Sequence, residues 1–128
     1  MFGGGLTIPL PDVDRTDHLL ILGANPLASN GSLMTAPDMR GRLRAIRERG
    51  GRIVVIDPRR TRTAELADEH HPIRPGRDAL LLAALAHTIV AEGLAEPGAL
   101  SGHVAGLDSI GGAVARFAPE AVEAACAI

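Results

Sequence analysis

Two short, continuous apolar runs constrain the fold of this chain more than any other feature of its sequence. After a polar start, the first is Asp17-His18-Leu19-Leu20-Ile21-Leu22, and the second is Arg52-Ile53-Val54-Val55-Ile56. Runs of this length without polar alternation are typical of strands that are buried on both faces in a parallel sheet. Gly23 ends the first run and Asp57-Pro58 ends the second, so the sequence predicts strands over 17–22 and 52–56.

A helix is predicted between these strands, over Ala36–Arg49. Thr35 and Asp38 have the spacing of a capping box, and Gly50-Gly51 follows where a helix terminator is expected. The stretch from Gly23 to Met34 is rich in Gly, Asn, Ser and Pro and is predicted to be a loop. A strand, a helix and a second strand in this order indicate an α/β fold with parallel strands.

The rest of the chain continues the alternation. A short helical turn is predicted over 61–67 and a third strand over Pro72-Ile73-Arg74, and helices are predicted over 78–92, 108–117 and 119–127, the first of them capped by Asp78. The expected fold is a three-layer open parallel sheet, Rossmann-like with about three strands, with extra C-terminal helices. Residues 1–16 are expected to form an extended lead-in, and residues 17–128 a single domain.

Length and composition exclude several classes of protein. A chain of 128 residues can bury one core, and its net charge of −2 gives no general attraction to nucleic acid or to anionic membranes. A single cysteine, Cys126, excludes a disulfide framework and any cysteine-ligated metal cluster within this chain. The longest apolar run, Ala79–Ala86, is too short to span a bilayer. No secretory signal is recognisable, and a bacterial cytoplasmic location is expected.

Three polar segments follow the ends of the predicted strands. They are Gly23-Ala24-Asn25-Pro26, Asp57-Pro58-Arg59-Arg60 and Pro75-Gly76-Arg77-Asp78. In an open parallel sheet, ligands bind outside the carboxyl ends of the strands, so these segments are expected to converge on one rim. Backbone N–H groups of the first segment could face a phosphate, Asp57 could accept hydrogen bonds from a ribose, and Arg59 could pair with phosphate.

Each of these residues also has a purely structural interpretation. The Gly23 segment could be a plain turn, and it does not have the G-x-G-x-x-G pattern of dinucleotide-binding loops. Asp57 could be a solvent-facing cap of the next turn, and Arg59 and Arg60 could be surface arginines. Asp78 could accept from N1–H and N2–H of guanine, or it could be an ordinary helix N-cap.

No catalytic set and no metal site are expected. The adjacent His70 and His71 would point to opposite faces of an extended segment, and His87 lies in an apolar helix where a core histidine is expected. The arginines between Arg40 and Arg52 lack interleaved aromatic residues, so no nucleic-acid partner is expected. No serine has the G-x-S-x-G context of a nucleophile.

Four segments, taken in order, resemble one known family. They are Leu20-Ile21-Leu22-Gly23-Ala24-Asn25-Pro26, then Gly51-Arg52-Ile53-Val54-Val55-Ile56-Asp57-Pro58-Arg59-Arg60-Thr61, then Ala67-Asp68-Glu69-His70, and then Ile73-Arg74-Pro75-Gly76-Arg77-Asp78-Ala79-Leu80-Leu81. The family is that of the molybdopterin oxidoreductases, which includes formate dehydrogenases, nitrate reductases and dimethyl sulfoxide reductase. The resemblance covers about residues 12–128.

The resemblance implies that this stretch is a fragment, truncated at both ends relative to the family, of a much larger catalytic subunit. It would form part of a Rossmann-like domain that holds a molybdopterin guanine dinucleotide, with molybdenum or tungsten carried by the parent protein. Gly23, Ala24, Asn25 and Pro26 would contact the dinucleotide phosphates. Asp57, Pro58 and Arg59 would lie along the guanosine, and Gly76 and Asp78 would grip the guanine.

The same resemblance implies that the metal ligand, any iron–sulfur cysteines and the second cofactor-binding domain lie outside this stretch. The chain alone is therefore expected to be inactive and to bind no cofactor tightly. Its partners would be the remaining domains of the parent, with a homo-oligomer formed through exposed apolar faces as a further expectation. Arg77 departs from the family pattern, in which a small polar residue is common at this position.

Two other functions remain open from the sequence. One is a non-catalytic α/β interaction module that keeps the fold but binds no nucleotide. The other is the nucleotide-binding central domain of another α/β enzyme, such as a thiamine-diphosphate enzyme. The combination of Asp57-Pro58-Arg59 with Pro75-Gly76-Arg77-Asp78 argues against this last alternative.

Overall fold

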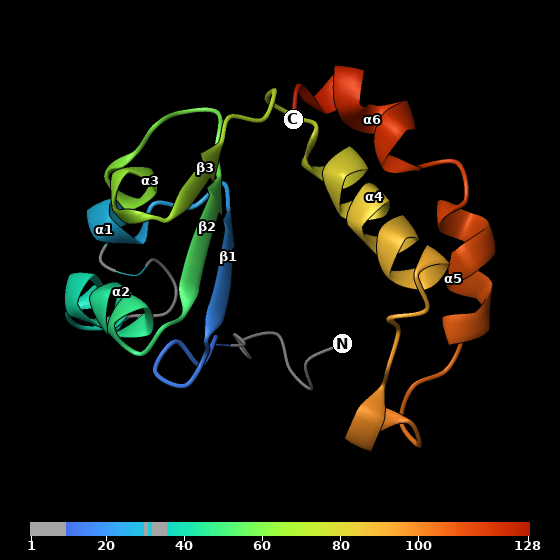
Figure 1. Cartoon of the computed structure of the whole chain (residues 1–128), viewed down its shortest axis with the longest axis horizontal. Helices are drawn as coiled ribbons and strands as arrows, with labels where there is room; N and C mark the ends of the chain where they lie inside the picture. The colour runs from blue at the N-terminus through green and yellow to red at the C-terminus, as the bar shows by residue number, and fades with distance from the viewer. Residues whose placement is uncertain (1–9, 30, 32–35) are drawn as a thin grey trace. The chain divides into compact units, whose positions relative to one another are not determined.

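The structure is a computed structural model that describes residues 10–29, 31 and 36–128 (Figure 1). It divides into two compact units, Met1–Pro72 and Ile73–Ile128. The first unit contains the sheet, and the second unit contains helices. Each unit is described by itself.

Three parallel strands form one open sheet in the first unit. They are β1 (His18–Leu22), β2 (Arg52–Ile56) and β3 (Glu69–His71), in the order β1-β2-β3. The α/β fold class with an open parallel sheet is therefore confirmed. The first strand begins one residue later than predicted, and the second has the predicted bounds.

The third strand was predicted at the wrong residues. It pairs with β2 through Val54 opposite Glu69 and Ile56 opposite His71, so it occupies 69–71 and not 72–74. Pro72 has no N–H group with which to continue the ladder, which explains why the strand ends before it. Ile73 is 1% exposed, so its apolar character reflects burial and not a place in the strand.

Three helices cover one face of this sheet: α1 (Pro26–Ser29), α2 (Met39–Glu48) and α3 (Arg62–Leu66) (Figure 1). The expectation of a loop over 23–34 is wrong at α1, which forms one helical turn. The α2 helix begins after Asp38, whose carboxylate accepts from the N–H of Gly41 at 3.0 Å. Thr35, the other half of the expected capping box, lies outside the described residues.

The core of the first unit lies between the sheet and these helices. Leu43 and Ile46 of α2 and Ile53 and Val55 of β2 are completely buried there. Because side chains alternate along a strand, Leu20 lies on the opposite face of the sheet, where it is 40% exposed. The third layer that was expected on this opposite face stays a prediction.

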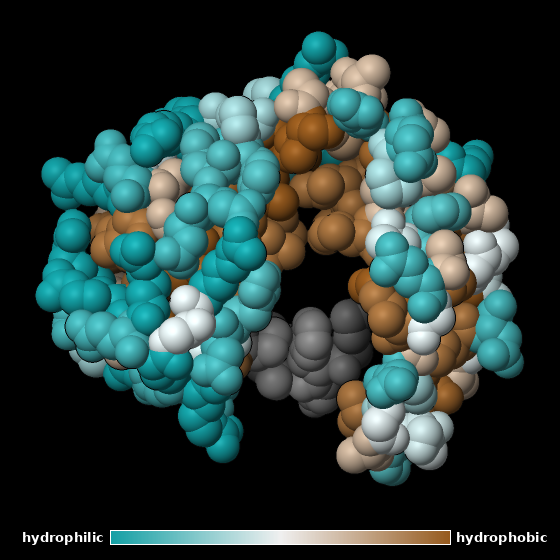
Figure 2. Space-filling model, viewed as in Figure 1, coloured by the Kyte–Doolittle hydropathy of each residue, from teal (hydrophilic) through white to brown (hydrophobic). Residues whose placement is uncertain are grey.

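The second unit consists of α4 (Asp78–Ala91), the short 3₁₀ helix η2 (Gly98–Leu100), α5 (Leu107–Val114) and α6 (Pro119–Cys126). The α4 helix packs against both α5 and α6. Several large apolar side chains of α4 remain exposed, and Figure 2 shows hydrophobic surface over this unit. Among the described residues, no helix has the length and apolar character required to cross a bilayer.

Candidate nucleotide site

The register of the sheet brings the first two predicted segments to the same edge. Leu22 pairs with Ile56 at the carboxyl ends of β1 and β2, and the N–H of Gly23 donates to the carbonyl of Ile56 at 2.9 Å. Gly23 and Asp57 are the next residues along their strands. The segments that begin at these two residues therefore lie side by side, as the topology predicted.

Some backbone N–H groups between Gly23 and Leu27 already donate to other protein groups. Gly23 N–H is bonded to Ile56, and the N–H of Leu27 donates to Thr63 Oγ1 at 3.2 Å. In the described part of the chain, no protein acceptor is recorded for the N–H groups of Ala24 and Asn25. Among the described residues, these two backbone donors are therefore available to a ligand, a distinction within the loop that the sequence does not indicate.

Gly23 makes a close approach to this loop possible. Its φ is +57°, a left-handed conformation that side chains with a Cβ rarely adopt, and the position that a Cβ would occupy has no atom within 4 Å. Among the described residues, the space directly beside Gly23 is therefore open.

The side chain of Asn25 is held by Thr63, a residue that no sequence motif singled out. Thr63 of α3 donates from its hydroxyl to Asn25 Oδ1 at 2.8 Å. Thr63 is completely buried, although it is polar. Its only sequence signal is a hydroxyl residue at the second position of a short helix whose cap is already supplied by Thr61.

Asp57 is buried, with 6% of its surface exposed, so the alternative interpretation of Asp57 as a solvent-facing residue is wrong. Its Oδ1 accepts from the N–H of Arg59 at 2.8 Å, which closes a tight turn after β2. Its second carboxylate oxygen has no recorded partner among residues 10–29, 31 and 36–128. The helix that follows is capped by Thr61, whose Oγ1 accepts from Ala64 N–H at 3.2 Å, and not by Asp57.

The arginines of this segment are free to meet an anion. Arg59 and Arg60 are exposed, and within the described ranges neither forms an ion pair. Most other arginines of the first unit, by contrast, pair with carboxylates, as Arg47 does with Asp68 at 2.8 Å. The positions of Arg59 and Arg60 fit either a phosphate contact or an ordinary surface role.

Gly76 and Asp78 belong to the second unit. Gly76 has φ +74° and open space at its Cβ position, and it forms the turn before α4. The helix cap is Arg77, so the interpretation of Asp78 as the N-cap is wrong: Asp78 is the first residue of α4. Its half-buried carboxylate has no hydrogen bond or ion pair recorded within the described part of the chain. Convergence of Asp78 with Asn25 and Asp57 stays a prediction.

Three histidines make polar contacts with protein groups. His70 Nε2 donates to the backbone carbonyl of Asp57 at 2.9 Å, and His71 Nε2 lies 2.8 Å from Glu69 Oε2. His87 is half-buried, and its Nδ1 donates to the carbonyl of Val114 at 3.1 Å. No group of three or more His, Cys, Asp or Glu side chains suited to a metal occurs among the residues that the structure describes.

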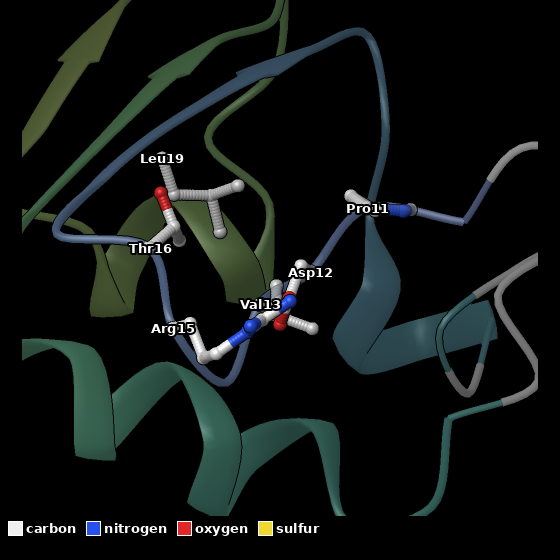
Figure 3. A pocket seen from close by; sticks show the side chains of 6 residues that line it. All are labelled: Pro11, Asp12, Val13, Arg15, Thr16 and Leu19. Carbon is white, nitrogen blue, oxygen red and sulfur yellow. The ribbon is translucent and has the colours of Figure 1, made fainter.

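One hollow of the first unit lies away from this edge. It has a volume of about 440 Å³ and lies beside the start of β1, where Figure 3 shows its six lining residues, among them Asp12, Arg15 and Leu19. The guanidinium of Arg15 hydrogen-bonds the carboxylate of Asp12 and lowers the pKa of that carboxyl. This exposed pair marks the opposite end of β1 from Gly23, so this hollow is separate from the candidate nucleotide site.

A family model described as "Molybdopterin oxidoreductase" matches residues 3–106. This match covers most of the chain, including every residue of the three polar segments. The chain belongs to the molybdopterin oxidoreductase family. The resemblance that was read from the sequence is thereby confirmed.

Relatives in this family are redox enzymes of several kinds. The chain is 28% identical over 128 residues to the F420-dependent formate dehydrogenase subunit alpha of Methanocaldococcus jannaschii, which covers 99% of this chain and 18% of that protein. It is 31% identical over 125 residues to the thiosulfate reductase molybdopterin-containing subunit PhsA of Salmonella typhimurium, covering 94% of this chain and 15% of that protein. The chain therefore spans under a fifth of the length of these relatives.

A solved structure has a similar fold. Acetylene hydratase from Pelobacter acetylenicus matches 92% of this chain and 16% of its own chain, with a TM-score of 0.75 and 26% sequence identity. The molybdopterin oxidoreductase fold is thus shared with an enzyme that is named for a hydration. The family implies a molybdenum or tungsten pterin cofactor.

Proposed function

We propose that this chain binds the guanosine diphosphate end of a molybdopterin guanine dinucleotide, within a larger molybdopterin oxidoreductase. The observation that carries the proposal is the pair of free N–H groups on Ala24 and Asn25, beside Asp57 at the carboxyl ends of β1 and β2. Ligands of open parallel sheets bind at this edge. Free backbone donors there suit a phosphate.

The residues present fit the proposed ligand. Ala24 and Asn25 would donate to the phosphates, and the open space at Gly23 leaves room for them. The unpaired carboxylate oxygen of Asp57 would accept from a ribose hydroxyl, and Arg59 would add a charged contact to phosphate. Pro26 follows the free donors and Pro58 follows Asp57, and both fix the backbone at the turns.

Guanine recognition is assigned to Gly76 and Asp78. A carboxylate can accept from both N1–H and N2–H of guanine, a pair of contacts that adenine cannot reproduce. The free, half-buried carboxylate of Asp78 supports this role, because no other partner is recorded for it among the described residues. Discrimination between purines should therefore depend on Asp78 more than on the phosphate loop.

The bound cofactor would supply two-electron redox chemistry at molybdenum or tungsten. This chain's own part is to hold and orient one end of the ligand. A single wall buries little of a ligand, so we expect weak binding by the chain alone and no turnover of substrate. The remaining domains of the parent protein would complete the site.

A second reaction class deserves a test for the whole protein. Acetylene hydratase, whose structure matches 92% of this chain, is named for hydration and not for electron transfer. The nucleotide-binding proposal is the same for both classes, since it concerns only the distal end of the cofactor. An assay of the whole protein with artificial electron acceptors would separate them.

Calorimetric titration with guanosine diphosphate and adenosine diphosphate tests the proposal. We expect the chain to prefer guanosine diphosphate, and we expect Asp78→Asn to remove most of this preference. Asp108→Asn is the matched control, because Asp108 is also an acidic residue in the first turn of a helix. Equal binding of both nucleotides by the unmodified chain would contradict guanine recognition. No binding of either nucleotide would favour the interaction-module alternative.

A further inference from the structure

Two hydrogen bonds meet at one buried hydroxyl beside the candidate site. Thr63 Oγ1 accepts from the N–H of Leu27 at 3.2 Å and donates to Asn25 Oδ1 at 2.8 Å. The side chain of Thr63 is 0% exposed. Thr63 therefore cannot reach a ligand itself, and any effect it has on binding must pass through Asn25 or Leu27.

The single hydroxyl proton of Thr63 determines which way the Asn25 side-chain amide is oriented. A hydroxyl has one proton to donate, and a buried hydroxyl that leaves this proton unpaired is destabilised. Asn25 Oδ1 is the acceptor that the structure gives to Thr63. The amide oxygen must then face Thr63, and the two N–H donors of Nδ2 must face away from it.

The same contacts fix the backbone around Asn25. The carbonyl of Asn25 accepts from the N–H groups of Ala28 and Ser29 at 2.9 and 3.1 Å. The N–H of Leu27, the remaining donor at the start of α1, is taken by Thr63. Within the ranges that the structure describes, the N–H groups of Ala24 and Asn25 and the Nδ2 of Asn25 thus remain as donors in a fixed arrangement.

We propose that Thr63 is a positioning residue of the nucleotide site, which turns the Nδ2 donors of Asn25 toward the phosphate. The inference deepens the proposed function and rests on it. The presence of a buried hydroxyl at position 63 is not explained by capping of α3, because Thr61 is the N-cap and accepts from the N–H of Ala64. A donor held in advance binds an anion without the loss of rotamer freedom that a mobile side chain would suffer.

The test measures guanosine diphosphate binding by calorimetry on the full 128-residue chain and on its variants. Thr63→Val keeps the shape of the side chain and removes both hydrogen bonds, and Thr63→Ser keeps the hydroxyl. Thr61→Val is the matched control, because it weakens the same helix without touching Asn25. Asn25→Asp retains the acceptor for Thr63 and removes the Nδ2 donors, so it tests the orientation even if Thr63→Val does not fold.

We expect Thr63→Val, Asn25→Ala and Asn25→Asp each to weaken binding about tenfold or more, the range for loss of a hydrogen bond to a charged group. Thr63→Ser and Thr61→Val should bind as the unmodified chain does. The double variant Thr63→Val/Asn25→Ala should bind no more weakly than the weaker of its two single variants, because both changes remove one shared contact.

Three results would overturn the inference while leaving the proposed function in place. They are unchanged binding by Thr63→Val, unchanged binding by Asn25→Asp, and a double variant whose loss is the product of the two single losses. Absence of guanosine diphosphate binding by the unmodified chain is a different outcome. It would overturn the proposed function, and the inference with it.

Discussion

Thr63 Oγ1 lies 2.8 Å from Asn25 Oδ1, although the two residues are 38 positions apart in the sequence. The contact joins the segment after β1 to the helix after β2. It therefore links the segment that begins at Gly23 to the helix that follows the segment 57–60. We therefore expect both the folding stability of this region and its affinity for a nucleotide to depend on residues that follow β1 and on residues that follow β2.

Replacement of Gly23 by alanine should destabilise the chain by backbone strain alone. The φ of +57° costs a residue with a Cβ about 1–2 kcal/mol, and the open space around the position adds no steric clash. Urea unfolding measures this loss. Gly112→Ala is the control, because Gly112 lies inside α5 and the change should stabilise that helix by about 0.5–1 kcal/mol. Equal effects of the two substitutions would contradict this account.

Asp68 should be important for pairing between β2 and β3. One of its carboxylate oxygens accepts from Ile53 N–H at 2.8 Å and the other pairs with Arg47 at 2.8 Å. Asp68→Ala leaves the N–H of Ile53 without this partner, which should lower the free energy of unfolding by about 1–3 kcal/mol. Chemical denaturation measures the loss, and Glu48→Ala on the exposed end of α2 should be nearly neutral. If Asp68→Ala left the free energy of unfolding unchanged, the prediction would be contradicted, and water would be the replacement partner for the N–H of Ile53.

The core between α2 and the sheet should depend strongly on Leu43. This residue is completely buried, so Leu43→Ala should destabilise the first unit by about 2–5 kcal/mol through lost burial and a cavity. Leu94, 61% exposed in the second unit, provides the matched control, and Leu94→Ala should change stability by less than about 0.5 kcal/mol. Thermal unfolding distinguishes the two. If Leu43→Ala lowered the stability by no more than Leu94→Ala, the burial of Leu43 between α2 and the sheet would be contradicted.

Exposed apolar side chains should cause the chain to self-associate. Leu20 on the outer face of β1 is 40% exposed, and Ile89 on α4 is 44% exposed. Static light scattering should show a mass that rises with concentration, and Leu20→Ser should reduce this rise. A constant monomer mass for the unmodified chain over the same concentrations would refute the prediction.

The sequence predicted those elements whose signals are local. The β2 strand has the predicted bounds because its β-branched run ends at Asp57-Pro58, where proline stops the ladder. The β3 strand was misplaced because its position depends on pairing with Val54 and Ile56, which no local pattern of residues 69–74 reveals. The α1 turn was missed for a similar reason, since its first N–H is satisfied by the distant Thr63.

The candidate site was predictable at the level of segments but not of atoms. Topology alone placed Gly23 and Asp57 at one edge of the sheet. Which N–H groups of the loop remain free depends on partners such as Ile56 and Thr63, and these are fixed only by folding. The N-cap interpretation of Asp78 failed because α4 begins at Asp78 itself, so the cap position falls on Arg77, one residue before it.

The most direct test of the central claim is a nuclear magnetic resonance titration of the ¹⁵N-labelled chain with guanosine diphosphate. One nucleotide held by three segments should shift the backbone signals of Ala24 and Asn25, of Asp57 and Arg59, and of Gly76 and Asp78 together, with a single dissociation constant. Shifts confined to one of these segments, or shifts of the three that saturate at different concentrations, would contradict a shared site.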